Sequence, residues 1–187
     1  MHHAPAFTAV LFGLRGCLIQ DAAGTPMPAP GALDTLHGLR DQQVPCIWLD
    51  ELNARQGRQL ARALPDWLPG QSNHGSPWPA PNACWEALMT LGSERLDGCV
   101  LVSGEPRLLQ AGLNAGLWTV GLAACSPTCN STGAHWQSLS LQEQELARGK
   151  ATLALFSVGV HSVIDHLEAL DACLDDIAQR RRKGEKP

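Results

Sequence analysis

Nucleophilic and acidic side chains lie within five residues after three apolar segments of this sequence, near the places where short buried strands would end. They are Cys17 after residues 8–12, Asp50 after 45–49, and Ser103 and Glu105 after 99–102. Ligands of open parallel sheets bind at the carboxyl ends of the strands, so a carboxylate such as Asp50 could serve acid or base chemistry there. We favour a structural interpretation, because an aspartate after a strand also caps a helix, here one that begins at Glu51.

Three further groupings each have a chemical and a structural interpretation. Cys17 could act as a nucleophile, but no histidine base can be assigned to it, so we predict a buried thiol. Ser103 and Gly104 could donate to an oxyanion, although a strand-to-helix turn uses such residues for its own cap. The C-x3-C-x5-H spacing from Cys125 to His135 offers three metal ligands where structural zinc sites use four, so we expect a loop there.

The elements that would position these side chains alternate between short apolar runs and helical stretches, a pattern typical of a parallel sheet with helices on both faces. The predicted strands are residues 8–12, 45–49, 99–102, 118–122 and 161–164. The predicted helices are residues 31–41, 51–64, 79–91, 106–115, 141–156 and 165–180. We expect one domain over residues 1–178 and a flexible basic tail over 179–187.

Composition narrows the class of protein. The net charge of -4 argues against a nucleic-acid partner, apart from the basic tail, because binding to phosphates needs a concentrated basic face. No apolar run approaches the roughly 18 residues of a membrane span, and the first residues lack the lysines or arginines of a signal peptide. Seven cysteines, an odd number, fit buried thiols in a reducing compartment. We therefore expect a cytoplasmic protein.

The first apolar segment resembles a known catalytic motif. Thr8 to Ile19 reads TAVLFGLRGCLI, an apolar strand followed by G-x-R-G-C. This is similar to motif one of the haloacid dehalogenase-like hydrolases, in which the strand runs into D-x-D-G-T. The resemblance places Gly13 at the nucleophilic aspartate, Arg15 at the aspartate that is general acid and base, and Cys17 at the threonine.

Later segments resemble one branch of that superfamily, the phosphonoacetaldehyde hydrolases. Asn114 to Gly121 reads NAGLWTVG, close to the N-A-G-M-W-T-V-G that follows motif four in this branch. Gly75 to Pro79, GSPWP, is similar to its G-R-P-x-P, and Gly159 to Ile177 to its terminal strand and acidic helix. The resemblance implies an α/β fold, a Rossmann-like three-layer sandwich of about five parallel strands with helices on both faces.

The residues that this chemistry requires are altered. In motif four, Glu105 stands at the first metal-binding aspartate and Leu109 at the second. Lysine occurs only at Lys150, Lys183 and Lys186, so none falls where motif three would supply the cation that holds the phosphoryl group. Magnesium prefers several oxygen ligands, so one remaining carboxylate predicts weak or absent magnesium binding and no other cofactor or metal.

The segment between motifs one and two is too short for the cap domain that the resemblance would imply. Enzymes of the phosphonatase branch carry a helical cap between motifs one and two, whereas Leu18 to Val44 has room here for a loop and one helix. In motif two, Trp48 and Leu49 fall where a hydroxyl is expected. A site without a lid stays wet, and water weakens the electrostatic stabilisation of developing charge.

Arg15 has two interpretations. With Ser103 and Glu105 it could form a metal-free pocket that binds an anion through its guanidinium fork. The interpretation that we favour is that Arg15 pairs with Glu105 across the former active site.

These observations predict a protein without phosphohydrolase activity that acts through protein interaction or regulation. No catalytic role is expected at the degenerate positions Gly13, Arg15, Cys17 and Leu109. The expected partner is an unidentified protein or a second copy of the chain, because a macromolecule can reach a pocket that has no cap. The alternative is a divergent hydrolase of macromolecular or uncapped phosphates that uses Asp50 or Glu105 unconventionally.

Overall fold

The computed structural model describes residues 7–22, 25–72, 75–127, 129, 136 and 138–187. Its centre is a six-stranded parallel sheet in the order β5-β4-β1-β6-β7-β8. The strands are β1 (Ala9–Gly13), β4 (Cys46–Asp50), β5 (Gly70–Ser72), β6 (Cys99–Ser103), β7 (Trp118–Leu122) and β8 (Ser162–Ile164). The sheet and its helices are the α/β sandwich that the sequence predicted, with one strand more.

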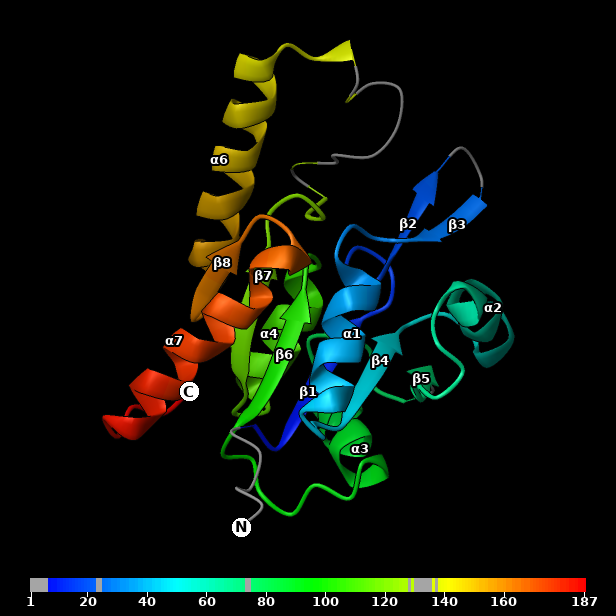
Figure 1. The fold of residues 1–187 in the computed structure, drawn as a ribbon, viewed down its shortest axis with the longest axis vertical. Helices are drawn as coiled ribbons and strands as arrows, with labels where there is room; N and C mark the ends of the chain where they lie inside the picture. The colour runs from blue at the N-terminus through cyan, green and yellow to red at the C-terminus, as the bar shows by residue number, and fades with distance from the viewer. Residues whose placement is uncertain (1–6, 23–24, 73–74, 128, 130–135, 137) are drawn as a thin grey trace.

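Two layers of helices cover the sheet (Figure 1). On one face lie α1 (Ala32–Asp41) and α7 (Leu170–Arg182), which pack on Val10, Phe12 and other alternate strand residues. On the other face lie α3 (Asn82–Thr90), α4 (Pro106–Asn114) and α6 (Leu141–Val158). The strands β1, β4, β6 and β7 are buried at every residue, as expected of parallel strands between two helical layers.

Two elements were not predicted. The edge strand β5 reads Gly-Gln-Ser and has no apolar pattern, so only its pairing with β4 makes it a strand. The antiparallel hairpin of β2 (Ile19–Ala22) and β3 (Thr25–Pro28) occupies part of the segment predicted to be a loop. The described residues between Cys17 and Pro45 thus form this hairpin and α1.

The helix predicted from Glu51 begins later. Asn53 is the N-cap of α2 (Ala54–Leu60), because its side chain accepts a hydrogen bond from the Gln56 backbone N–H at 2.9 Å. A short 3-10 turn, η1 (Ala61–Ala63), follows it. Asp50 is therefore not the cap of this helix, and the prediction that it is was wrong.

The C-terminal segment belongs to the folded body. A 3-10 turn, η2 (Leu167–Ala169), leads into α7, which continues to Arg182, so the boundary predicted between residues 178 and 179 falls inside a helix. Arg180 lies 4.9 Å above the buried Trp118 ring, and Arg181 lies over the Phe7 ring and contacts Asp97. Among the described helices, none combines the length and the apolar character that crossing a bilayer demands.

Candidate functional site

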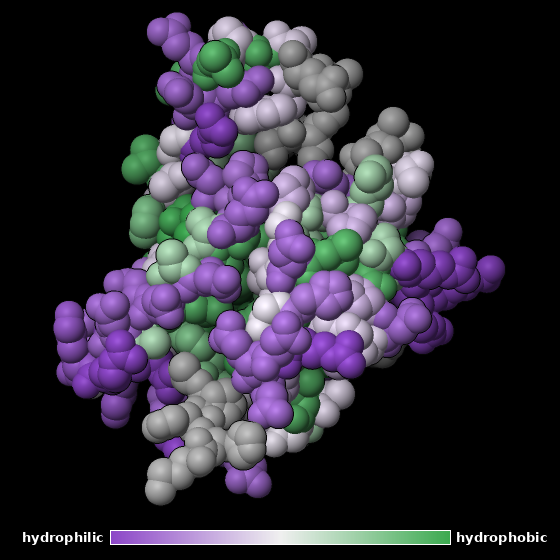
Figure 2. All heavy atoms as spheres, in the orientation of Figure 1, coloured by the Kyte–Doolittle hydropathy of each residue, from purple (hydrophilic) through white to green (hydrophobic). Residues whose placement is uncertain are grey.

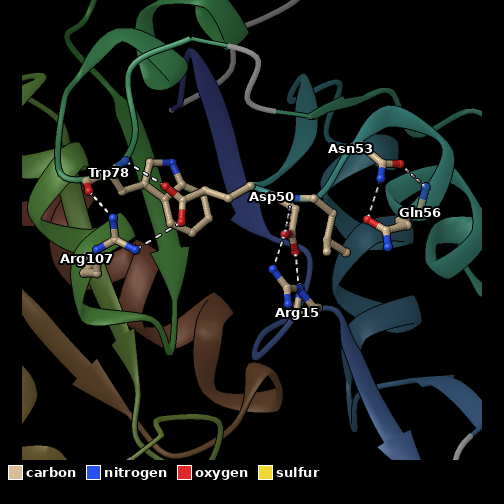
Figure 3. Close-up of polar contacts among 8 residues, drawn as sticks. Arg15, Asp50, Asn53, Gln56, Trp78 and Arg107 are labelled. Carbon is tan, nitrogen blue, oxygen red and sulfur yellow. Dashed lines mark hydrogen bonds and ion pairs between the residues drawn. The ribbon is translucent and has the colours of Figure 1, made fainter.

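The carboxyl ends of β1 and β4 are joined by an ion pair between Arg15 and Asp50 (Figure 3). Arg15 Nε donates to Asp50 Oδ2 at 2.9 Å and Arg15 Nη2 donates to Oδ1 at 2.5 Å, a two-pronged contact of the strong, charge-assisted kind. The pairing of Arg15 with Glu105 that the sequence led us to expect is wrong, because Arg15 pairs with Asp50 instead. Glu105 contributes only a longer-range charge to Arg15.

Asp50 is almost entirely enclosed, with 3% of its side chain exposed against 54% for Arg15. Besides the guanidinium, its carboxylate accepts from the backbone N–H groups of Arg15 and Leu52, at 3.3 and 3.0 Å. The hydrogen bond to Asp50 raises the pKa of Arg15 although partial burial opposes this, and the charges of Asp50, Glu51 and Glu105 add to the rise. Four donor contacts from protein atoms therefore balance the buried carboxylate.

The position of the nucleophile is closed. A Cβ atom added at Gly13 would lie 2.7 Å from Ser103 Oγ and 3.3 Å from Leu108 Cδ2. Ser103 is fully buried, and its hydroxyl accepts a hydrogen bond from the Glu105 backbone N–H at 3.0 Å. Any side chain at Gly13 therefore has to displace Ser103, since this approach is tighter than a real Cβ tolerates.

The loops after β1, β6 and β7 are in backbone contact beside this position. The Gly104 N–H donates to the Gly16 carbonyl at 3.0 Å, and a Cβ atom at Gly104 would lie 2.6 Å from the Cys125 carbonyl. Glycine at both positions permits this contact because it has no side chain. These loops lie at the carboxyl ends of the strands, the edge at which ligands of open α/β sheets usually bind.

The remaining candidate residues have structural roles. The Glu105 carboxylate caps α4 by accepting from the Arg107 backbone N–H at 3.1 Å, in line with the capping role considered for this turn. Leu109 is fully buried in the cluster beneath α6. Cys17 is fully buried, and this burial holds the pKa of its thiol well above the ordinary value. The prediction of a buried thiol at Cys17 is confirmed.

A second ion pair lies across the site and was missed by the sequence analysis. Arg107 Nη1 donates to Glu51 Oε2 at 3.1 Å, and Arg107 Nη2 donates to the Trp78 carbonyl. Glu51 Oε1 in turn accepts from the Trp78 backbone N–H at 2.8 Å, which joins the loop before α3 to the end of β4 (Figure 3). The available signals were the acid that follows Asp50 and the arginine in the first turn of α4, yet nothing in their spacing pairs them.

Other cations lie elsewhere. Arg58 and Arg62 line a hollow of about 550 Å³ beside β5, together with Trp48 and Asp66, and Arg95 pairs with Asp97. Among the described residues, no group of three or more histidine, cysteine or acidic side chains could hold a metal ion. His135, the third residue of the C-x3-C-x5-H spacing, lies outside the described residues.

Comparison with known proteins finds clear relatives, although no family model matches the chain. The phosphonoacetaldehyde hydrolase of Salmonella enteritidis is 27% identical over 174 residues, which are 86% of this chain and 62% of that protein. The chain thus spans less than two thirds of the length of this curated relative. A phosphonoacetaldehyde hydrolase-like protein from Oleispira antarctica is 26% identical, with a TM-score of 0.76 over 86% of this chain and 60% of its own.

Another solved structure has the same extent as this chain. It is 50% identical, with a TM-score of 0.90, and the match covers 97% of this chain and 100% of the other.

Proposed function

We propose that this chain, which belongs to the phosphonatase-like branch of the haloacid dehalogenase-like superfamily, has no phosphohydrolase activity and acts through protein binding or regulation. Its relatives are named as hydrolases, so the proposal rests on the site of this chain and not on its ancestry.

The closure around Gly13 carries this proposal. The ancestral nucleophile would stand at this residue, where a Cβ atom would lie 2.7 Å from Ser103 Oγ, so the buried Ser103 side chain would have to shift. Beside it, Arg15 puts a cation where the resemblance places the general acid and base, and Asp50 pairs with that cation. Phosphoryl transfer depends on positioning and on positive charge around the phosphoryl oxygens, and a neutralised, closed pocket supplies neither.

Two features support the proposal: the chain has no inserted cap among its described residues, and the cations nearest the site are already paired. The hairpin and α1 account for the described residues between Cys17 and Pro45, which fits a domain without an inserted cap. Both cations nearest the site, Arg15 and Arg107, are held in ion pairs whose partners belong to the protein. In an anion pocket of Arg15, Ser103 and Glu105, the ligand would compete with the Asp50 carboxylate for the Arg15 guanidinium, so we expect weak anion affinity in the native chain.

The alternative is a divergent hydrolase that uses Asp50 or Glu105. The buried carboxylate of Asp50 is paired with Arg15, and the carboxylate of Glu105 caps α4. A general acid or base must reach the proton that it transfers, so this alternative requires one of the two contacts to break on substrate binding.

The test is magnesium-dependent hydrolysis across an aryl phosphate, phosphonoacetaldehyde and phosphopeptides, with an active phosphonoacetaldehyde hydrolase as the positive control. We expect no turnover by the native chain. We expect none by Gly13→Asp/Arg15→Asp either, since Ser103 still occupies the space; adding Ser103→Gly to this pair removes that obstacle.

Turnover by the native chain that vanishes in Asp50→Asn or Glu105→Gln would overturn the proposal and establish a relocated catalytic site. Titration of the same variants with inorganic phosphate examines the anion pocket separately. Asp50→Asn should bind phosphate more tightly than the native chain because it releases the Arg15 guanidinium. Glu105→Gln, which leaves the Arg15 ion pair intact, is the matched control.

A further inference from the structure

The helix α6 carries an apolar stripe on its exposed side. Leu146, Leu153 and Phe156 are 60%, 69% and 50% exposed, and Gly149 lies between them on the same side. The four residues follow one another at spacings of three, four and three, which is the a and d pattern of a coiled-coil seam. An isolated exposed leucine needs no explanation, but a periodic row of them on one helix does.

The stripe points away from the body of the molecule. The opposite side of α6 buries Ala151 and Leu155 against β7 and α4, and Leu155 touches the position of Gly121. In Figure 1 the helix stands at the margin of the fold and its first turns rise beyond the sheet, and apolar surface is visible over this region in Figure 2. Within the described residues, half or more of each of the stripe's three apolar side chains stays exposed, so the stripe has room for a second chain.

The charges that flank the stripe indicate that a second copy of this chain could bind there. With Leu146 and Leu153 at a positions, Glu145 is a g position and Lys150 the following e position. In a parallel pair of helices, g of one chain faces e of the next heptad in the other, so Glu145 and Lys150 of two copies attract each other twice. An antiparallel pair would instead bring Lys150 near its own copy. Within the described residues, neither Glu145 nor Lys150 makes an ion pair.

Gly149 fits the same arrangement. A Cβ atom built at this residue meets no atom within 4 Å, so the backbone is open on this side. Two helices related by a two-fold axis would approach closely at Gly149, with the leucine layers on either side of it and the Phe156 layer beyond. The capping box of Ser140 and Glu143 fixes the start of the helix, so the seam is preformed.

We propose that the chain forms a two-fold symmetric dimer through parallel pairing of α6 with α6 of a second copy. This helix of 18 residues is about 27 Å long and offers little more than two heptads. A seam of that length gives a modest affinity, and we expect dissociation in the micromolar range.

The first experiment is analytical ultracentrifugation of the full chain over a concentration series. We expect a monomer–dimer equilibrium that Leu153→Glu shifts by at least about tenfold towards monomer, because it puts two carboxylates into the seam. The matched control is Met89→Glu on α3, which replaces another exposed apolar residue, 70% exposed, outside the stripe. A chain that stays monomeric at all concentrations, or a dimer that Leu153→Glu leaves intact, would overturn the proposal.

Charge exchange then examines the orientation. Glu145→Lys and Lys150→Glu should each weaken the dimer by about two- to tenfold, and the double variant should restore it. Under mild oxidation, Phe156→Cys should give a disulfide-linked dimer rapidly, because a parallel pair places every seam residue beside its own copy, whereas an antiparallel pair that meets at Gly149 keeps these two thiols apart. A dimer that neither responds to charge exchange nor crosslinks at this position would show an antiparallel or different interface and would refute the parallel arrangement.

Discussion

Arg15 and Asp50 illustrate how the exchange of one residue type changes what a site can do. A carboxylate as enclosed as that of Asp50 is costly to bury unless its charge is matched and its oxygens accept hydrogen bonds. In a metal-dependent site a cation would meet this need, whereas here the guanidinium and two backbone N–H groups meet it. Groups of the protein itself thus surround the Asp50 carboxylate with hydrogen-bond donors.

The buried side of His161 leads us to expect that the stability of the chain depends on pH. Burial and the nearby charge of Arg180 lower the pKa of His161 below its usual 6.5, and its neutral Nδ1 accepts a hydrogen bond from the Thr119 backbone N–H at 3.0 Å. Below about pH 6.5 the unfolded chain takes up a proton that the folded chain does not, so the free energy of unfolding falls as the pH falls. We expect His161→Gln to flatten this dependence below about pH 6.5.

The measurement is urea unfolding at a series of pH values. As the pH falls below about 6.5, the native chain should lose stability more steeply than His161→Gln, by a fraction of the roughly 1.4 kcal/mol per pH unit of one proton, because solvent screens this partly exposed ring. His166→Gln, which changes a histidine outside this contact, is the control for the loss of an imidazole. Superimposable pH profiles for the native chain and His161→Gln would contradict the assignment.

At the scale of elements, the edge strand β5 depends on a glycine. A Cβ atom at Gly70 would lie 1.6 Å from Trp48 Cε2, so the indole of β4 occupies the space that a side chain would need. Gly70→Ala must push the ring out of its place, and we expect a loss of at least about 3 kcal/mol in the free energy of unfolding, the upper range for overpacking. Chemical denaturation measures this change.

A matched control for that variant lies in α1. A Cβ atom at Gly38 meets nothing within 4 Å, and the residue is inside a helix, so Gly38→Ala should stabilise the chain by about 0.5–1 kcal/mol. Trp48→Phe in the Gly70→Ala background should recover part of the loss because the smaller ring vacates some of the space. Equal stability of Gly70→Ala and the native chain would show that the ring can move freely.

The difference between the central strands and the edge strand β5 explains how far the sequence could predict this fold. Strands with continuous apolar runs, such as Trp118–Leu122, were predicted at their observed bounds, because burial on both faces leaves a local pattern. The strand β5 leaves none, since its pairing with β4 and its packing on Trp48 arise only in the folded chain. The hairpin strand Thr25–Pro28 was hidden by its two prolines, which a central strand would exclude and a short outlying one tolerates.

The candidate site was predictable in its location and not in its pairing. The carboxyl ends of β1, β4 and β6 were expected to meet, and they do. Because β1 lies between β4 and β6, Arg15 could have turned to Asp50 or to Glu105, and one-dimensional spacing does not distinguish the two neighbours. The choice follows from tertiary geometry: the Leu14 N–H donates to the Leu49 carbonyl, which brings the residues after both strands together.

At the scale of the whole molecule, the two ends of the described chain meet below the sheet. Arg181 of α7 lies over the Phe7 ring, 5.4 Å from its centroid, and donates to Asp97, which precedes β6. Arg180 donates to the His161 carbonyl and covers the Trp118 ring. The last turns of α7 therefore contact Phe7, which begins the described chain, and also the segments that precede or form β6, β7 and β8.

This arrangement gives the last prediction. Deletion of residues 179–187 removes the cation over Trp118, the ion pair to Asp97 and the final turn of α7. A cation over an aromatic ring and a surface ion pair each contribute about 1 kcal/mol or less when exposed, and the buried Trp118 ring raises the first value. We expect a loss of about 2 kcal/mol in the free energy of unfolding, measured by urea denaturation. Deletion of 184–187 alone removes the Glu185 side-chain contact with Arg180 and two backbone hydrogen bonds at the exposed end of the helix, and it should change stability by less than about 1 kcal/mol. If the longer deletion unfolds at the same urea concentration as the shorter one, the contacts of Arg180 and Arg181 do not hold the sheet together, and the boundary after residue 178 marks the end of the folded domain.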